Sequence, residues 1–506
     1  IYGIDYMIQI LTALGNEPLK RGFSYYSSDS ERQSVLSHLL KVCMPKPEET
    51  SEDLKKALKG TDITKKRLAE LAMYARQWIP MIEEYLGIPG FASTCYYFLA
   101  HTSEGFDDQV TSTIAKYTPL SPEELKDGAF DIHWFFEAYG HVGEKNFRLL
   151  YDAAKYSSTG TAHGRARKYA DAALGKVEKE ALKSEIDAKR NKDLLMSLPL
   201  LPLADKKLKR EEELLDRYQF IQKYKKESRQ FGAQRRASEG RASEIALRNL
   251  SVNAGFTDVT RLVLRMEGKL TEQSQSYFDW QPLEEIELMI SVDENGKSSL
   301  NCRKDGKKLK SVPAKYKKNE TVKRYQEVNK RLKEQYSRTK QMMEQAMEDR
   351  TDFEVWEFLE LRKNPVVRPI VEFLVVRLSD HTDAVYADTK EHDTSDRASG
   401  DENAESRTAD VRPDSKMGFL TEDGIVDEAG NVIPVKPDDR ILIAHPFDLY
   451  SSGRWHEFQK LLFDRKIKQP FKQVFRELYL KLDEELEKTE SRLFSGNQIQ
   501  PQKTVG

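Results

Sequence analysis

Apolar residues recur at helical spacing through the first 175 residues, in runs of about ten to fifteen residues separated by short breaks. One break, SPEEL, offers Ser121 as an N-cap, Pro122 at the first helical position and Glu124 as the capping-box partner. Short helices with aromatic-rich faces are typical of helical-repeat proteins, although no exact repeat period emerges. Residues 1–175 are therefore predicted to form an irregular helical-repeat array.

The balance of residue types suits helices with one apolar stripe and broad charged faces, because 39% of the residues are apolar and 32% are charged. A chain of 506 residues is too long for one compact core, so about two to four domains are expected. The net charge is only −2, so the chain as a whole has no strong electrostatic field that would indicate binding to nucleic acid or membrane. Any charge argument therefore has to be local.

The three cysteines, Cys43, Cys95 and Cys302, are far apart and lack CxxC spacing. This usage favours a reducing compartment and argues against a disulfide framework or a cysteine-based zinc site. No apolar run approaches the roughly 20 residues that a membrane span needs. We expect a cytoplasmic protein with no membrane partner. Because the chain opens at Ile1 within an amphipathic helical pattern, we also expect it to be a fragment.

Residues 176–274 are predicted to form a charged helical connector. Two prolines within MSLPLLPLAD predict a buried connection there instead of a long helix. Residues 209–250 follow as one long helix or a kinked pair, which Gly255 ends. Thr257 or Asp258 then caps the next helix.

The periodicity changes to strand-like alternation over residues 283–313, around one NG and one DG dipeptide. Both dipeptides favour type I′ hairpins, so this stretch predicts a three-stranded meander. A long basic helix is expected over residues 318–349, followed by two helices split at Pro365. Together these elements make up a predicted segment of residues 275–378.

Residues 379–416 carry eleven acids against five Lys and Arg, a net charge of −6, and are predicted to be a disordered or loosely held acidic insertion. Residues 417–506 are predicted to contain a strand–turn–strand unit and two closing amphipathic helices. The last helix has an apolar stripe at i, i+3, i+4 and i+7, which consists of Phe471, Val474, Phe475 and Leu478. The predicted class is predominantly α (α+β overall), with a small antiparallel β-meander among the helices of the C-terminal module.

Four phrases in the sequence, FGAQRRASE, NAGFTDVTRL, DDRILIAHPFDLYSSGRWHEFQK and QPFKQVFREL, resemble a bacterial family known as domain of unknown function 4132. The resemblance runs from about residue 230 to the end, and the helical N-terminal part is also similar to some members. It implies no particular reaction. Some relatives are labelled molybdate metabolism regulators, and some carry a WGR module, of which this sequence has no signature.

The sequence contains no GxSxG, HExxH, P-loop or GxGxxG motif, so we expect no cofactor and no metal. His445 ends the apolar run ILIAH and precedes Asp448, an arrangement that permits a general base. A histidine that caps the strand–loop junction is the favoured interpretation. With His456, these residues are too loosely spaced to indicate a metal site.

Two segments are locally basic. Residues 303–350 contain sixteen Lys and Arg against seven acids, and residues 205–250 contain thirteen against eight. Basic helices with nearby tyrosines can follow a nucleic-acid backbone. A solvated helical hairpin explains the same charge and is favoured on composition alone. The acidic insertion could also lie against the second segment and regulate access to it.

In the stretch QFGAQRRASEGRASEIALRN, Ala233, Ala237 and Gly240 leave one helix face nearly bare, so we expect another helix to pack closely there. Glu244 is spaced to pair with Arg248 and with the arginine at i−3. Lys472 and Arg476 lie off the apolar stripe of the last predicted helix, where they either bind an anion or pair with acids. The candidate anion or partner contacts are Arg235, Arg236, Arg241, His445, Lys472 and Arg476.

The preferred prediction is a non-enzymatic cytoplasmic scaffold or regulatory interaction protein that binds a protein partner through helical surfaces. The second hypothesis is a nucleic-acid-associated protein that uses residues 205–250 and 303–350. The third is an enzyme of unrecognised type centred on His445.

Overall fold

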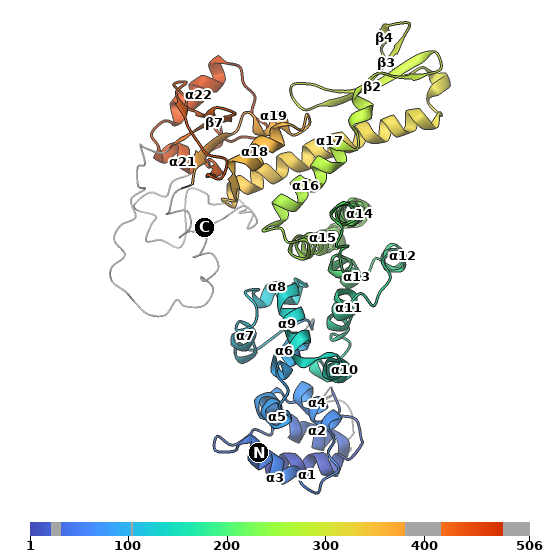
Figure 1. Cartoon of the computed structure of the whole chain (residues 1–506), viewed down its shortest axis with the longest axis vertical. Helices are drawn as coiled ribbons and strands as arrows, with labels where there is room; N and C mark the ends of the chain where they lie inside the picture. The colour runs from blue at the N-terminus through green and yellow to red at the C-terminus, as the bar shows by residue number, and fades with distance from the viewer. Residues whose placement is uncertain (22–31, 103–104, 380–415, 479–506) are drawn as a thin grey trace. The chain divides into compact units, whose positions relative to one another are not determined.

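The computed structural model describes residues 1–21, 32–102, 105–379 and 416–478. By its internal contacts the chain divides into two compact units, Ile1–Leu262 and Val263–Gly506 (Figure 1). Helices build the first unit, and two antiparallel sheets lie among the helices of the second. The predicted class, predominantly α with a β part towards the C-terminus, is confirmed. The finer predicted boundaries stay predictions, and the acidic insertion lies outside the described residues except at its two ends.

Short connections separate the helices of the first unit. These helices are α1 (Ile4–Leu14), α2 (Arg32–Val42), α3 (Ser51–Leu58), α4 (Lys65–Tyr74), α5 (Ile79–Leu86), α6 (Phe91–Ala100), α7 (Asp108–Ile114), α8 (Pro122–Asp127), α9 (Ile132–Val142), α10 (Glu144–Ala153), α11 (Gly164–Ala173), α12 (Lys179–Lys189), α13 (Lys192–Ser197), α14 (Lys207–Glu227) and α15 (Ala233–Ala254). The predicted capping box of α8 is confirmed, because Ser121 and Glu124 each accept the backbone N–H of the other, at 3.2 and 2.8 Å.

An aromatic core joins α6, α9 and α11. The ring centroid of Tyr97 lies 5.1 Å from that of Phe135 and 6.1 Å from that of Phe130. The Tyr97 hydroxyl donates to the Ala166 carbonyl at 2.9 Å. Aromatic pairs at these separations add to the free energy gained by burial alone. The aromatic-rich helix faces seen in the sequence therefore form the contacts of this core.

His101 lies inside the same core with no exposed surface. Its ring stacks on Phe130 with the centroids 5.2 Å apart, and neither ring nitrogen has a hydrogen-bond partner among the described residues. Burial lowers the pKa of His101 to about 3, and Arg165 acts in the same direction. The imidazole is therefore neutral at physiological pH and packs as an aromatic ring.

The connector MSLPLLPLAD is buried, as predicted, and a long polar side chain satisfies its backbone. Leu198 and Leu200 are at most 1% exposed. Arg217 of α14, 2% exposed, donates to the carbonyls of Leu201 at 2.7 Å and Pro202 at 2.8 Å. Leu201 and Pro202 lie outside the helices, so no N–H of a helix is available to their carbonyl groups.

Asn249 of α15 forms hydrogen bonds with backbone groups of a second irregular stretch, which precedes α9. It accepts the N–H of Phe130 at 3.0 Å and donates to the carbonyls of Gly128 at 3.3 Å and Met196 at 3.2 Å. Helices α14 and α15 are separate, with a break at residues 228–232, which confirms the kinked-pair alternative. Asp258 accepts the N–H of Arg261 at 2.8 Å, as predicted for the cap of α16 (Val259–Glu272).

The second unit begins with a four-stranded sheet, one strand more than predicted. Its strands are β1 (Gln281–Leu283), β2 (Ile286–Val292), β3 (Ser298–Lys304) and β4 (Lys307–Leu309), paired in chain order. The sheet packs on the N-terminal half of α17 (Glu320–Glu348), as Figure 1 shows, through buried residues that include Leu288, Ile290 and Leu332. The predicted basic helix is thus confirmed.

Only one of the two hairpin turns has the predicted form. Asp305 and Gly306 both have positive φ, at 50° and 75°, as a type I′ turn requires. At the first turn Gly296 alone is positive, at 74°, and its N–H donates to the Asp293 carbonyl at 2.9 Å. That loop is longer than two residues, so the type I′ prediction is wrong there.

A six-stranded antiparallel sheet completes the second unit. Its strands are β5 (Asp352–Glu354), β6 (Val375–Leu378), β7 (Met417–Thr421), β8 (Gly424–Val426), β9 (Val432–Ile433) and β10 (Arg440–Ile443), in the order β5-β10-β6-β7-β8-β9. The helices beside it are α18 (Val355–Arg362), α19 (Arg368–Val371), α21 (Pro446–Ser451) and α22 (Trp455–Asp464). Met343 and Met347 of α17 lie in the core under this sheet, so α17 packs against both sheets.

One predicted helix is wrong, and the last predicted helix is not helical over its described residues; the rest of it lies outside the described residues. The helix expected after Pro365 is reduced to α19, and the apolar run that follows is the central strand β6. A fully buried strand shows no alternation, so its sequence cannot be told from that of a helix. Residues 471–478 are not helical; Phe471 and Val474 of the expected stripe are buried, but Phe475 is 49% exposed.

Gln473 explains the non-helical path of this segment. Its side chain has no exposed surface; it accepts the N–H of Val375 at 2.9 Å and donates to the carbonyls of Val375 at 2.7 Å and Ala444 at 2.8 Å. The backbone groups at these ends of β6 and β10 thus gain buried partners, which a helix on residues 471–478 would have to supply in another way.

His101 generates a pH prediction. The folded pKa is about 3 and the ordinary value is 6.5, so below pH 6.5 the unfolded chain binds a proton that the folded chain does not. The free energy of unfolding should therefore fall by about 1.4 kcal/mol per pH unit between pH 6 and pH 4, and His101→Phe should remove this component. Urea denaturation of both proteins across this range measures it; parallel curves would contradict it.

Two glycines form a matched pair for a packing prediction. A Cβ on Gly418 in β7 would lie 2.1 Å from the Val426 carbonyl oxygen, whereas one on Gly240 in α15 would meet no atom within 4 Å. Gly418→Ala should destabilise the second unit by about 3 kcal/mol. Gly240→Ala should stabilise the first by about 0.5–1 kcal/mol. Chemical denaturation followed by circular dichroism tests both, and a wild-type transition for Gly418→Ala would refute the close contact.

Candidate functional site

The arginines of α15 are occupied by internal contacts. Arg235 donates to Glu239 at 2.9 Å, and its guanidinium lies 3.7 Å from the ring centroid of Phe231. Arg241 pairs with Asp127 and Arg248 with Glu124, both on α8. The predicted pairing of these two arginines with Glu244 is wrong, since Glu244 accepts from Lys225 instead, at 3.0 Å. Arg236 alone of the candidates in this helix is exposed without an ion-pair partner among the described residues.

The predicted close packing on the face of Ala233, Ala237 and Gly240 is also wrong, because both alanines are exposed and a Cβ on Gly240 would meet no described atom within 4 Å. The buried face starts at Glu239, 2% exposed, and continues through Ala242 and Ser243. Burial opposes the charge of Glu239, but hydrogen bonds from Arg190 and Arg235 hold its pKa below the ordinary value. A buried carboxylate with two arginines thus lies at the start of the packed face; Arg235 is at i−4 of Glu239, but the pairing with Arg190 was not visible in the local sequence.

His445 caps a helix. It is the N-cap of α21: its N–H donates to Asp448 at 2.8 Å, and its Nδ1 accepts the N–H of Phe447 at 3.2 Å. Burial lowers the pKa of His445, against the opposing effect of Asp448, while Arg350 and Arg476 lower it further. A neutral ring whose Nδ1 accepts carries its proton on Nε2, so the lone pair that a general base needs is already bound by the backbone.

The charges around His445 are balanced. Asp448 lies 3.2 Å from Arg350 and 3.4 Å from Arg377, and Arg476 pairs with Glu344 at 3.3 Å and with Glu348. Arg476 therefore pairs with acids, the second of the two alternatives open from the sequence. It lies close enough to lower the pKa of His445, but it belongs to ion pairs with α17.

The remaining candidates do not join this network. Lys472 is exposed and has no described ion-pair partner, and the Nδ1 of His456 lies 3.1 Å from the Gln459 side-chain oxygen. In the described ranges no three His, Cys, Asp or Glu side chains are arranged to hold a metal ion. No helix in the described part of the chain has both the length and the apolar run that crossing a bilayer demands. Cys43, Cys95 and Cys302 are all buried free thiols.

The two basic segments differ in which of their Lys and Arg side chains form ion pairs. Residues 303–324 hold ten Lys and Arg against two acids, a net charge of +8. Six exposed side chains there lack an ion-pair partner among the described residues, and we call them the basic patch: Lys307, Lys308, Lys310, Lys317, Lys318 and Arg324. Glu285 links the two halves of this region, since it accepts from Lys304 at 2.8 Å and from Lys315 at 3.2 Å.

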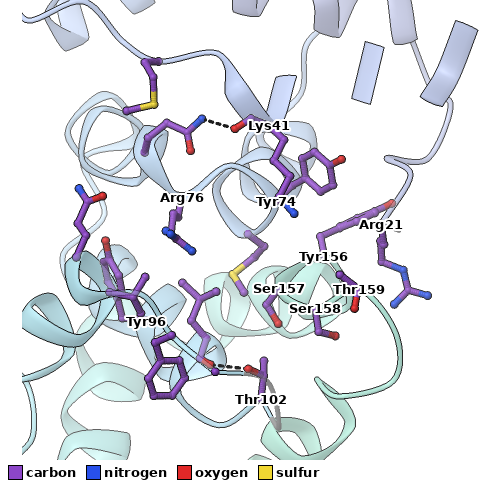
Figure 2. A pocket seen from close by; sticks show the side chains of 18 residues that line it. Arg21, Lys41, Tyr74, Arg76, Tyr96, Thr102, Tyr156, Ser157, Ser158 and Thr159 are labelled. Atoms are coloured by element: carbon purple, nitrogen blue, oxygen red, sulfur yellow. Dashed lines mark hydrogen bonds between the residues drawn. The ribbon is translucent and has the colours of Figure 1, made fainter. Parts of the chain in front are cut away.

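Figure 2 shows a hollow in the first unit. About 360 Å³ of space lies between helices α2, α4, α6 and α7 and the segment 156–159. Three cations line it, Arg21, Lys41 and Arg76, and no carboxylate of the described residues does. Its hydroxyls come partly from YSST at 156–159, the start of a glycine-containing basic stretch whose sequence pattern favours a plain loop.

Comparison with protein families divides the chain in the same two parts. Residues 1–266 match a family of unknown function, DUF5724, and this match covers more than half of the chain. The chain belongs to the DUF5724 family. Residues 306–506 match a domain of unknown function, DUF4132, so the resemblance predicted from the sequence is confirmed, although it begins at residue 306 and not near residue 230. No curated protein and no solved structure matches this chain.

The hollow and the arginines of α15 lie in the DUF5724 part. The basic patch, His445, Lys472 and Arg476 lie in the DUF4132 domain. The phrase FGAQRRASE, on which the resemblance was partly based, falls within the DUF5724 match. Neither family description supplies a reaction, so function has to be argued from the sites.

A substitution at His445 separates a cap from a catalytic group in the DUF4132 domain. His445→Asn keeps a side-chain acceptor for the backbone of α21 and should leave stability within about 0.5 kcal/mol of wild type. His445→Ala removes the acceptor and should cost about 1 kcal/mol. Denaturation midpoints measure the difference; equal losses in both variants would show that the hydrogen bond to Phe447 does not stabilise the helix.

Proposed function

We propose that this protein acts by binding, as a scaffold without a reaction of its own, and that the basic patch binds the phosphate backbone of nucleic acid. The supporting observation is the group of six exposed cations without described ion-pair partners in a region of net charge +8. Unpaired cations attract phosphates and release condensed counterions on binding, whereas paired ones have already lost that capacity. Buried free thiols fit a cytoplasmic setting for this binding.

The chemistry of the patch favours nucleic acid over an acidic protein. Protein interfaces depend on buried aromatic and arginine anchors, but five of the six patch residues are lysines. Of the three tyrosines predicted to help, Tyr316 and Tyr325 are buried at 3% and 4% exposure and cannot stack on bases, and the partly buried Tyr336 packs against the hydrophobic cores. We therefore expect contact with phosphates and no reading of base sequence.

The other basic segment, 205–250, contributes little to this proposal. Arg217 is buried, Arg235, Arg241 and Arg248 are paired, and Lys223 pairs with Asp187 at 3.0 Å. A protein partner on the helical surfaces stays a prediction. Of the large apolar side chains exposed on the described surface, Ile1, Tyr2 and Met44 lie together at the Tyr2–Met44 bridge, and others lie on separate helices, where single exposed apolar residues are normal.

The tetrapeptide KKLK occurs twice and provides a matched test. Substitution of Lys307, Lys308 and Lys310 by Gln should weaken binding of a labelled 20-base-pair duplex at least about tenfold at low salt. The slope of log affinity against log salt concentration should also become shallower, by the amount expected for the loss of about three phosphate contacts. The same change at Lys206, Lys207 and Lys209, which also are exposed but precede three glutamates, should have little effect. Fluorescence anisotropy with two unrelated duplexes measures both.

The proposal fails if the wild-type chain binds neither duplex at low salt, or if both triple variants lose affinity equally. If the protein binds an acidic polypeptide but binds neither duplex, the patch is assigned to a protein partner instead.

A further inference from the structure

The hollow of the first unit has the features of a binding site for a small anion. Its walls come from segments far apart in the chain: Lys41 is on α2, Arg76 follows α4, and Ser157 ends the turn after α10. In Figure 2 the side chains of Lys41 and Arg76 extend into the space from one side, and Ser157 lies across from them. About 360 Å³ is within the range of small-molecule sites.

The charge of the hollow is one-sided. Lys41 is exposed, has no described carboxylate within ion-pair distance, and has its ammonium 5.9 Å from the ring centroid of Tyr74. Arg21 is held by the carbonyls of Lys155 at 3.0 Å and Gly160 at 2.8 Å, contacts that orient its guanidinium but do not neutralise it.

Arg76 is the one lining cation with a described acid partner, Asp107, which is not itself part of the wall. Over the residues that the structure describes, the three cations against Asp107 leave a local charge of +2. A phosphate monoester carries roughly −1.5 to −2 at neutral pH, so its charge complements that of the hollow.

The rest of the lining suits the organic part of such a ligand. Met73, Leu99 and Val110 provide apolar surface, and Tyr96 and Phe106 add aromatic rings. Thr102, Ser157, Ser158 and Thr159 add hydroxyl groups to the lining. Mixed apolar and polar linings with a few oriented charges are typical of sites that bind small organic molecules.

We propose that this hollow binds a small organic phosphate, a phosphate monoester with a planar body, through Lys41, Arg76 and Arg21. Lys41 and Arg76 contact the phosphate, Arg21 adds positive potential from the opposite wall, and the apolar and aromatic side chains cover the body. The site is independent of the basic patch, which lies in the other unit.

Phenyl phosphate, phenol and inorganic phosphate are suitable probes, and ligand-observed NMR titration measures weak binding to the full chain. Phenyl phosphate should bind at least tenfold more tightly than phenol, and inorganic phosphate should compete with it. Lys41→Met should weaken phenyl phosphate binding about tenfold. Lys66→Met, an equal charge change at an exposed lysine of α4 outside the hollow, should leave it unchanged.

A double variant separates the role of Arg76 from net charge. Arg76→Gln with Asp107→Asn removes the ion pair without altering total charge, and Asn keeps an acceptor for the Val110 N–H that Asp107 caps at 3.0 Å. Affinity should fall about tenfold while the thermal unfolding midpoint stays near wild type. Equal binding of phenol and phenyl phosphate, or wild-type affinity in both Lys41→Met and the double variant, would overturn the proposal. Unchanged binding in the triple variant of the basic patch would show that the two sites are separate.

Discussion

The structure depends on polar side chains that satisfy buried backbone where no helix or strand can. Arg217 does this for the proline-rich connector, Asn249 for the turn before α9, and Gln473 for the ends of β6 and β10. An unpaired backbone group in such places costs about as much as a lost hydrogen bond, and often more. Irregular segments can therefore lie inside both units only because long side chains from distant elements reach them.

Tertiary contacts also divide the basic side chains of this protein into two groups, those that pair with acids and those without a described ion-pair partner. In the first unit, arginines on α15 pair with acids of α8 and with the buried Glu239, so their charge is used inside the fold. In the second unit the basic patch has no such partners among the described residues. Both stretches look alike by composition. Availability for a ligand depends on whether tertiary structure brings an acid to each cation.

Local signals in the sequence predicted much of the fold. The capping box at Ser121, the cap at Asp258 and the long basic helix are all formed by residues that are neighbours in the chain, and each is present. The meander was predicted with one strand too few. The errors fall where long-range contacts override local pattern: Val375 and Val376, on opposite faces of β6, are both buried, and residues 471–478 leave the helical path to place Gln473 between two strands.

The sequence by itself determined the helical class, the helix boundaries with local caps, the place of the β segments and the resemblance to DUF4132. These depend on periodicity and on contacts within a few residues. Only the tertiary structure decided which arginines are neutralised by distant acids, and that Lys41, Arg76 and Ser157 surround one hollow. Those features depend on residues brought together from distant segments, and no local pattern records such distances.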